Sequence, residues 1–173
     1  FVSPGEDHCL RESDNLRIIE LHCPTYPLWE QVALPRAVAK IKPDLLHCTS
    51  NTAPIHCPVP LVLTLHDIIF MEPRKSGNKS LYQNMGWHYR RLVVPRILKK
   101  AKKIITVSHF ECTRIREALR LPDGQITTVY NGYSRHFYPQ EDPSPITRKY
   151  IEESRYLFFL GNTDPKKNVP RTL

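Results

Sequence analysis

The chain has 173 residues, of which 40% are hydrophobic and 24% charged, and this balance supports a packed core and excludes wholesale disorder. No run approaches the ~18 consecutive apolar residues of a membrane-spanning helix, because His66 and Asp67 interrupt the most apolar stretch, 61–71. The formal net charge of +8 favours anionic partners such as phosphate groups, acidic membrane surfaces or nucleic acid, without choosing among them.

Continuous apolar runs predict six strands. Runs such as LVLTL, IITV and YLFFL are continuously apolar rather than alternating, which is typical of parallel strands covered on both faces. Sixteen prolines against six glycines also argue against a sandwich built from glycine hairpins. In chain order, the predicted strands are Arg17–Leu21, Asp44–Cys48, Leu61–Leu65, Lys103–Val107, Ile126–Tyr130 and Tyr156–Leu160.

Helices are predicted between these strands. The apolar spacing predicts helices over 28–41 and 80–101. A third helix is predicted over 108–121, because Ser108 is followed three residues later by Glu111, as in a capping box. Alternating strands and helices of these lengths predict an α/β domain with a mostly parallel sheet and helices on both faces.

The composition changes after residue 133. Residues 134–154 are polar and contain three prolines, which is typical of a linker, and the apolar run at Tyr156 then begins another domain. We therefore predict a Rossmann-like domain over 1–133, an interdomain linker over 134–154, and the first strand and loop of a second domain over 155–173. We also expect the chain to be a fragment, since it does not begin with Met.

The first candidate site residues follow the strand at Leu61–Leu65. Ligands of open α/β sheets bind beyond the carboxyl ends of the strands, where this chain has His66 and Asp67. A neutral imidazole can accept or donate a proton near pH 7, and a neighbouring carboxylate can orient it. Alternatively, the histidine bonds a backbone carbonyl and Asp67 caps the following turn. The sequence leaves both interpretations open.

Further candidates follow the other strands. Ser108 begins a helix whose N-terminus could bind an anion, although a simple helix cap is an equal alternative. Asn131 and Gly132 follow the next strand, where Asn-Gly is also a common turn. After the last predicted strand, Gly161 permits close approach and Lys166–Lys167 supplies positive charge, so this segment could cradle a diphosphate.

Taken together and in this order, these motifs resemble those of a retaining glycosyltransferase of the GT-B fold, in the group 1 or GT4 family. The resemblance covers about residues 44–168 and includes a G-x4-K-K-N opening and an Asn-Gly pair followed by Phe-x-Pro. It runs through DLLHCTSN, PLVLTLHDIIF, AKKIITVSHFECTRIREAL, ITTVYNGYSRHFYP and YLFFLGNTDPKKN. It implies two Rossmann-like domains across a cleft, the first for an acceptor and the second for a nucleotide-diphosphate sugar.

On the acceptor side, the resemblance implies that His66 matches the family's cleft histidine, which contacts the transferred sugar and helps to position the acceptor. We expect Asp67 to orient this imidazole, and Ser108, Asn131 and Gly132 to line the same cleft. The implied reaction transfers a sugar from a nucleotide-diphosphate sugar to a glycan or lipid-linked acceptor, with retention of configuration. Neither a metal nor another cofactor is expected.

On the donor side, the resemblance implies that Gly161 and Lys167 match the glycine and lysine that hold the donor's diphosphate. Lys166 falls where the family often has Arg, and Asn162 falls where some members have a second diphosphate Arg. The family's first strand and glycine-rich acceptor loop would precede this chain, and its paired-glutamate motif would follow it. We therefore expect the fragment to be inactive by itself.

Two alternatives concern the class of protein and its partners. A non-enzymatic Rossmann-like nucleotide-binding module would show the same alternation of strands and helices. A basic run over 90–103, predicted as an amphipathic helix, could dock on an anionic membrane or form a solvated outer face. Nucleic acid is not expected as a partner, because no helix-turn-helix pattern or aromatic stripe accompanies the run. Its basic residues are Arg90, Arg91, Arg96, Lys99, Lys100, Lys102 and Lys103.

The five cysteines indicate a reducing compartment, because their odd number and wide spacing provide neither a disulfide framework nor a C-x-x-C motif. Four His-Cys dipeptides raise zinc as an alternative. Neighbouring residues of a strand point to opposite faces, however, so each dipeptide offers only one ligand to a site. We therefore expect no metal site, and a cytoplasmic protein that is at most peripheral on the inner membrane face.

Overall fold

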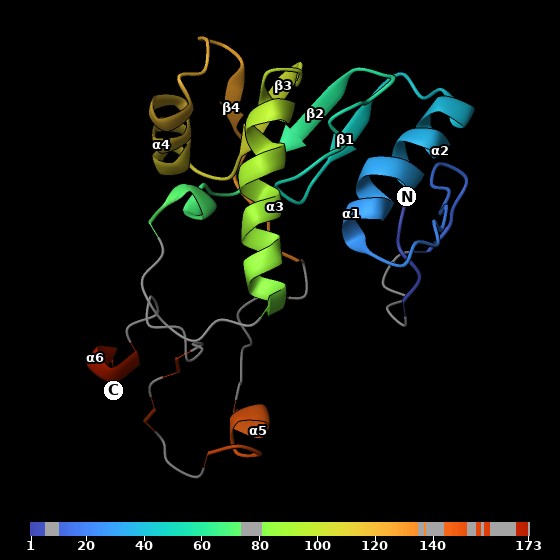
Figure 1. Ribbon diagram of the computed structural model, residues 1–173. Coiled ribbons are helices and arrows are strands. Elements are labelled where there is room, and N and C mark those ends of the chain that lie inside the picture. The colour runs from blue at the N-terminus through green and yellow to red at the C-terminus, as the bar shows by residue number, and fades with distance from the viewer. Residues whose placement is uncertain are drawn as a thin grey trace. The chain divides into compact units, whose positions relative to one another are not determined.

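Four strands form one parallel sheet in the computed structural model of the protein (Figure 1). They lie side by side in chain order, and every neighbouring pair is parallel. The predicted α/β, Rossmann-like architecture is therefore confirmed. The strands are β1 (Leu46–Cys48), β2 (Leu61–Thr64), β3 (Lys103–Thr106) and β4 (Ile126–Thr128).

The structure describes residues 1–5, 11–73, 81–134, 137, 144–151, 155–156, 158–159 and 169–172. The chain divides into two units, Phe1–Asn131 and Gly132–Leu173. The sheet belongs entirely to the first unit. The second unit contains the short helices α5 (Ser144–Thr147) and α6 (Val169–Thr172).

Helices of the first unit connect the strands. α3 (Leu81–Leu98) lies between β2 and β3, after a short 3₁₀ turn, η2 (Ile69–Met71), and α4 (His109–Leu119) joins β3 to β4. One continuous helix precedes β1 and is made of α1 (Tyr26–Leu28), a π-helical segment η1 (Trp29–Ala33) and α2 (Leu34–Ile41). All three predicted helices are thus confirmed, the first with a π-helical segment inside it.

The hydrophobic core lies between the sheet and these helices. Residues on both faces of the central strands are covered, since Leu63 and Ile104 are fully buried while Val62 and Ile105 are half-buried. Burial of each large aliphatic side chain contributes roughly 1.5–3 kcal/mol. This packing fixes where the carboxyl ends of the strands lie. The helices contribute Leu34, Val38, Val93, Val94, Ile97, Leu98 and Ile115 to the core.

The predicted strand at Arg17–Leu21 is wrong. This segment makes only a one-residue parallel bridge, between Val2 and Glu20. The Val2 N–H donates to the Ile19 carbonyl at 3.0 Å, and the Leu21 N–H donates to the Val2 carbonyl at 2.9 Å. Among the described residues, the segment meets the N-terminal stretch rather than the sheet, and a bridge of one residue does not form a ladder.

The predicted strand at Tyr156–Leu160 is also wrong for the three of its residues that are described. Tyr156, Phe158 and Phe159 lie in no strand, and residues 157 and 160 are outside the described residues. A strand needs a partner to satisfy its backbone groups, and the described part of the second unit contains no other strand. The division into domain, linker and second domain stays a prediction.

The predicted basic face over 90–103 is divided between structural elements. α3 ends at Leu98 and Lys103 lies in β3, so the run is not a single helix. Four of its side chains donate to backbone carbonyls of the same unit: Arg91, Arg96, Lys100 and Lys103. These cations are held against the protein, which leaves fewer of them for a common solvent-exposed face.

Candidate active site

The carboxyl ends of the four parallel strands meet along one side of the sheet (Figure 1). Backbone hydrogen bonds continue past the strand ends. The Asn51 N–H donates to the Thr64 carbonyl at 3.1 Å, and the Val129 N–H donates to the Thr106 carbonyl at 2.8 Å. The segments that follow the strands are therefore neighbours, as the sequence predicted. We call these segments, residues 49–52, 65–67, 107–109 and 129–131, the carboxyl edge.

His66 is half-buried in the carboxyl edge and is held at two atoms. Its ring Nε2 lies 2.8 Å from the Thr49 carbonyl oxygen, and its backbone N–H donates to Asn51 Oδ1 at 2.6 Å. A carbonyl can only accept, so Nε2 carries a proton and the neutral ring keeps its lone pair on Nδ1. Asn51 has a φ of 65°, a left-handed conformation that Asn tolerates better than most residues. The segment after β1 thus fixes both the place and the tautomer of His66.

Asp67 does not orient His66, contrary to the prediction. Its Oδ1 accepts from the Ile69 N–H at 3.0 Å and so caps η2. Neighbouring residues of an extended segment project in different directions, and the Thr49 carbonyl orients the imidazole instead. The geometry therefore agrees with the other interpretation of the sequence, in which the histidine bonds a backbone carbonyl and Asp67 caps the following turn. The bond to the Thr49 carbonyl is compatible with a functional role for His66, since a backbone carbonyl commonly fixes the tautomer of a functional imidazole.

Ser108 caps α4 as predicted. Its Oγ accepts from the Glu111 N–H at 3.1 Å. The Glu111 carboxylate accepts from Arg114 at 2.7 Å, and Arg114 also donates to Glu72 at 2.9 Å. The bonds to Glu111 and Glu72 raise the pKa of Arg114. This cluster ties the segment that follows His66 to the first turn of α4, whereas anion binding at Ser108 stays a prediction.

The remaining predicted site residues are only partly placed. Asn131 is exposed at the end of the first unit, and Gly132 begins the second unit. Next to Asn131, the Tyr130 ring meets the His109 ring edge-on, with centroids 5.5 Å apart. The predicted diphosphate-binding residues lie outside the described residues, so that cradle stays a prediction. They are Gly161, Asn162, Lys166 and Lys167.

A buried carboxylate beside the carboxyl edge was missed by the sequence analysis. Glu30, in η1, is 2% exposed. It accepts from Thr52 Oγ1 at 2.6 Å and from the Tyr26 hydroxyl at 2.8 Å, and it also accepts from the Tyr89 hydroxyl. One signal could have found it: Glu30 precedes the buried residues Leu34 and Val38 at intervals of four, so it lies on the apolar face of the helix.

The environment of Glu30 raises the pKa of three neighbouring groups. Burial, with the nearby Glu30 charge, raises the pKa of Tyr26 from 10.0 to about 12. Burial and the bond to Glu30 raise the pKa of Tyr89. Burial raises the pKa of the Cys48 thiol from 9.0 to about 12, with Glu30 and Cys57 as further causes. The phenols, which are protonated at neutral pH even at their ordinary pKa, therefore remain hydrogen-bond donors to higher pH, and Cys48 is a poor thiolate nucleophile.

Within the described ranges, no group of three or more His, Cys, Asp or Glu side chains is arranged to share a metal ion. Of the four His-Cys dipeptides, three are described. In one of them, His47 Nε2 lies 2.8 Å from Thr64 Oγ1, so this ring bonds a hydroxyl of the adjacent strand. Among the described helices, none has both the length and the apolar character that crossing a membrane requires.

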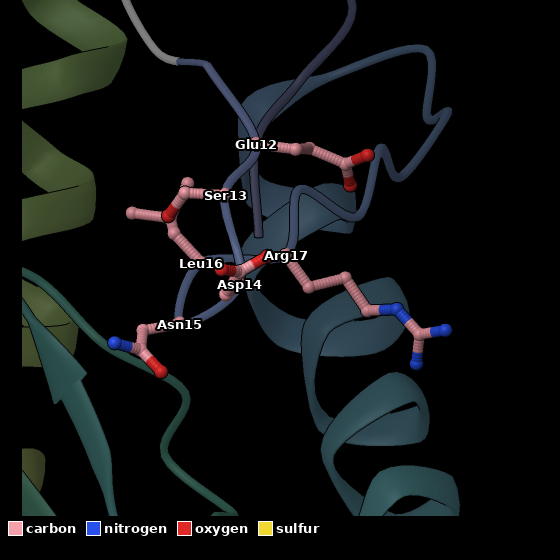
Figure 2. Close-up of a pocket in the computed structure, with 6 residues that line it drawn as sticks. All are labelled: Glu12, Ser13, Asp14, Asn15, Leu16 and Arg17. Atoms are coloured by element: carbon pink, nitrogen blue, oxygen red, sulfur yellow. The ribbon is translucent and has the colours of Figure 1, made fainter.

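A pocket of about 380 Å³ is lined by residues outside the carboxyl edge (Figure 2). Its lining is one turn of consecutive, exposed residues, in which Ser13 and Leu16 exchange two backbone hydrogen bonds of 3.0 Å. No segment of the carboxyl edge contributes to it, and we assign it no function. The lining residues are Glu12, Ser13, Asp14, Asn15, Leu16 and Arg17.

A parallel sheet with polar side chains beyond its carboxyl ends defines an α/β domain of the ligand-binding, Rossmann-like class. The family model described as Glycosyltransferase Family 4 matches residues 2–136. The chain therefore belongs to glycosyltransferase family 4, and its general chemistry is the transfer of a sugar from a donor to an acceptor. Comparison with curated proteins and with solved structures gave no match.

Proposed function

We propose that this chain supplies the acceptor-side domain of a retaining glycosyltransferase, which transfers a sugar from a nucleotide-diphosphate sugar to a glycan or lipid-linked acceptor. The observation that carries the proposal is His66, held at the carboxyl edge by Thr49 and Asn51. Membership of the family supports the class of reaction. Polar residues beyond parallel strands are where α/β domains bind their ligands.

His66 acts in this proposal by alignment. Because Nε2 donates to the Thr49 carbonyl, the neutral ring offers Nδ1 as an acceptor for a sugar hydroxyl. Retention requires attack from the face of the leaving group, so the departing phosphate can itself take the acceptor's proton. His66 therefore holds donor and acceptor in a reactive arrangement, which can contribute several kcal/mol to catalysis.

The donor's diphosphate is assigned to the C-terminal segment of the chain. Lys167, together with Lys166 and the backbone after Gly161, would stabilise the negative charge that develops as the glycosidic bond breaks. Asn162 would supply a neutral contact beside them. These residues would work with a following donor-binding domain, and the reaction would need no metal because lysine side chains supply the positive charge.

Replacement of His66 tests this function in the complete protein, assayed with a panel of nucleotide sugars. We expect His66→Ala to lower turnover by roughly 100-fold or more, as is typical when a group that acts at the reacting centre is lost. His22→Ala is the matched control, because His22 is exposed and lies outside the carboxyl edge, and it should leave turnover unchanged. The anomeric configuration of the product, read by NMR, tests retention.

Two results would contradict the proposal. Near-normal turnover of His66→Ala would remove the role of His66. If the complete protein binds nucleotide sugars but never transfers the sugar, the chain is instead a non-enzymatic nucleotide-binding module.

A second candidate function, docking on an anionic membrane surface, is favoured by the outer face of α3. Leu81, Met85 and Leu92 fall within about 40° of one another on the helix, and they are 82%, 67% and 53% exposed. Arg96, near the C-terminal end of α3, and Lys99, in the turn that follows the helix, are also exposed. Figure 1 shows that the N-terminal half of α3 extends past the carboxyl ends of the strands. An apolar stripe that ends in cations suits an interface of acyl chains and acidic headgroups.

Vesicle binding by the complete protein tests this second function. We expect binding to vesicles rich in anionic lipid, weak binding to neutral vesicles, and a loss of about tenfold in affinity for Met85→Gln combined with Leu92→Gln. Leu28→Gln is the control, since Leu28 is an exposed apolar residue of α1. Binding that ignores lipid charge, or that the double variant retains, would contradict membrane docking.

A further inference from the structure

Glu30 and Gln31 are consecutive residues of η1 that bond the same loop. We name residues 49–55, which follow β1, the β1 loop. Glu30 accepts from Thr52 Oγ1 at 2.6 Å. Gln31 donates to the Ala53 carbonyl at 3.0 Å and accepts from the Ile55 N–H at 2.9 Å. The pair therefore bonds one side chain and two backbone groups in the second half of the β1 loop.

α3 also contributes to this network through Tyr89. The Tyr89 hydroxyl donates to Glu30 and accepts from Gln31 Nε2 at 2.8 Å. The Tyr26 hydroxyl also donates to Glu30. Hydroxyl donors thus meet the Glu30 carboxylate from α1, from the β1 loop and from α3. Burial raises the pKa of both phenols, so these hydroxyls remain hydrogen-bond donors to higher pH.

The first half of the β1 loop holds His66. The Thr49 carbonyl accepts from Nε2, and Asn51 Oδ1 accepts from the His66 backbone N–H. Thr52, the next residue after Asn51, is 4% exposed, and Ala53 is fully buried. The residues that bond His66 are followed directly in the chain by those that bond Glu30 and Gln31. Displacement of Thr52 would therefore also displace the groups that orient His66.

We propose that Glu30 and Gln31 are positioning residues that set the orientation of His66 through the β1 loop. This inference rests on the proposed function of His66 in the cleft. Glu30 cannot itself touch a substrate, because its side chain is buried and both of its oxygens accept hydrogen bonds from the protein. Its contribution to sugar transfer is therefore indirect, through the place of Thr52.

Thr52→Val is the decisive variant, because it removes the hydroxyl that joins Glu30 to the β1 loop and keeps the shape of the side chain. Thr106→Val is the matched control. Thr106 is also fully buried beside the carboxyl edge, but its hydroxyl has no hydrogen-bond partner within the described residues. Tyr89→Phe offers a second test, since it removes one donor to Glu30 from α3.

The measurements use the complete protein well below its melting temperature. We expect Thr52→Val to lower kcat by about tenfold while KM changes by less than about threefold, because misalignment affects reacting groups more than binding. We expect the His66 backbone amide to exchange with solvent about tenfold faster, and the nitrogen NMR signals of its ring to shift. Tyr89→Phe should change the same quantities in the same direction, and Thr106→Val should change none of them.

The outcomes separate this inference from the proposed function. If Thr52→Val lowers the melting temperature but leaves kcat, the His66 amide and the His66 ring signals unchanged, the network is only structural and the inference fails. If His66→Ala retains turnover, the proposed function fails. In that event, the amide exchange and ring signals of His66 in Thr52→Val still decide whether Glu30 positions it.

Discussion

The two halves of the carboxyl edge are held by different kinds of interaction. On the side of β1 and β2, side chains bond across elements, from His66 to Thr49 and from Glu30 to Thr52. On the side of β3 and β4, the hydroxyls of Thr106 and Thr128 are buried without a hydrogen-bond partner among the described residues. That side depends on apolar packing, on the cap of α4 and on the partly exposed ion pairs of Arg114 with Glu111 and Glu72.

The two kinds of interaction differ in how precisely they hold a group in place. Apolar packing is non-directional and tolerates small displacements, whereas a hydrogen bond weakens steeply when its angle or length changes. A network of short bonds therefore suits the half of the edge that must hold an imidazole in one orientation. The other half needs only to keep its strands and α4 in place.

Loss of the Glu30 carboxylate should have the largest effect. We expect Glu30→Ala to lower the free energy of unfolding by about 3 kcal/mol, because the hydroxyls of Thr52, Tyr26 and Tyr89 lose their shared acceptor. Denaturant-induced unfolding measures this change. Glu117→Ala is the control, since Glu117 is exposed on α4, and it should cost less than about 0.5 kcal/mol. Equal costs for the two variants would mean that side-chain bonding does not distinguish the β1–β2 side.

Loss of the α4 cap should have a smaller effect on the β3–β4 side. We expect Ser108→Ala to destabilise the protein by about 1 kcal/mol, because the Glu111 N–H loses its acceptor. Ser108→Asp should restore most of that loss, since a carboxylate also caps a helix N-terminus. Thermal unfolding measures both variants. If Ser108→Ala costs as much as Glu30→Ala, the two sides of the edge are held alike.

The sequence predicted the edge better than the network behind it. Continuous apolar runs gave the four strands, and the residue after each strand could then be placed, as with His66 and Ser108. The partner of His66 is 17 residues away in the chain, and Glu30 meets Tyr89 across 59 residues. Such bonds depend on how the helices pack, which local spacing does not determine. The erroneous strand at Arg17–Leu21 has the same origin, since a strand requires a partner as well as an apolar pattern.

High pH should also distinguish the two sides. The pKa of Tyr26 is raised from 10.0 to about 12, mainly by burial, so folding favours the protonated phenol. The resulting stabilisation is complete below pH 10 and is lost as the pH rises through about 12. We expect the free energy of unfolding to fall over this interval and to fall less steeply in Tyr26→Phe. Denaturant unfolding at several pH values, with the ultraviolet absorbance of the phenolate followed in parallel, measures both. An identical slope in Tyr26→Phe would mean that burial beside Glu30 does not protect this hydroxyl.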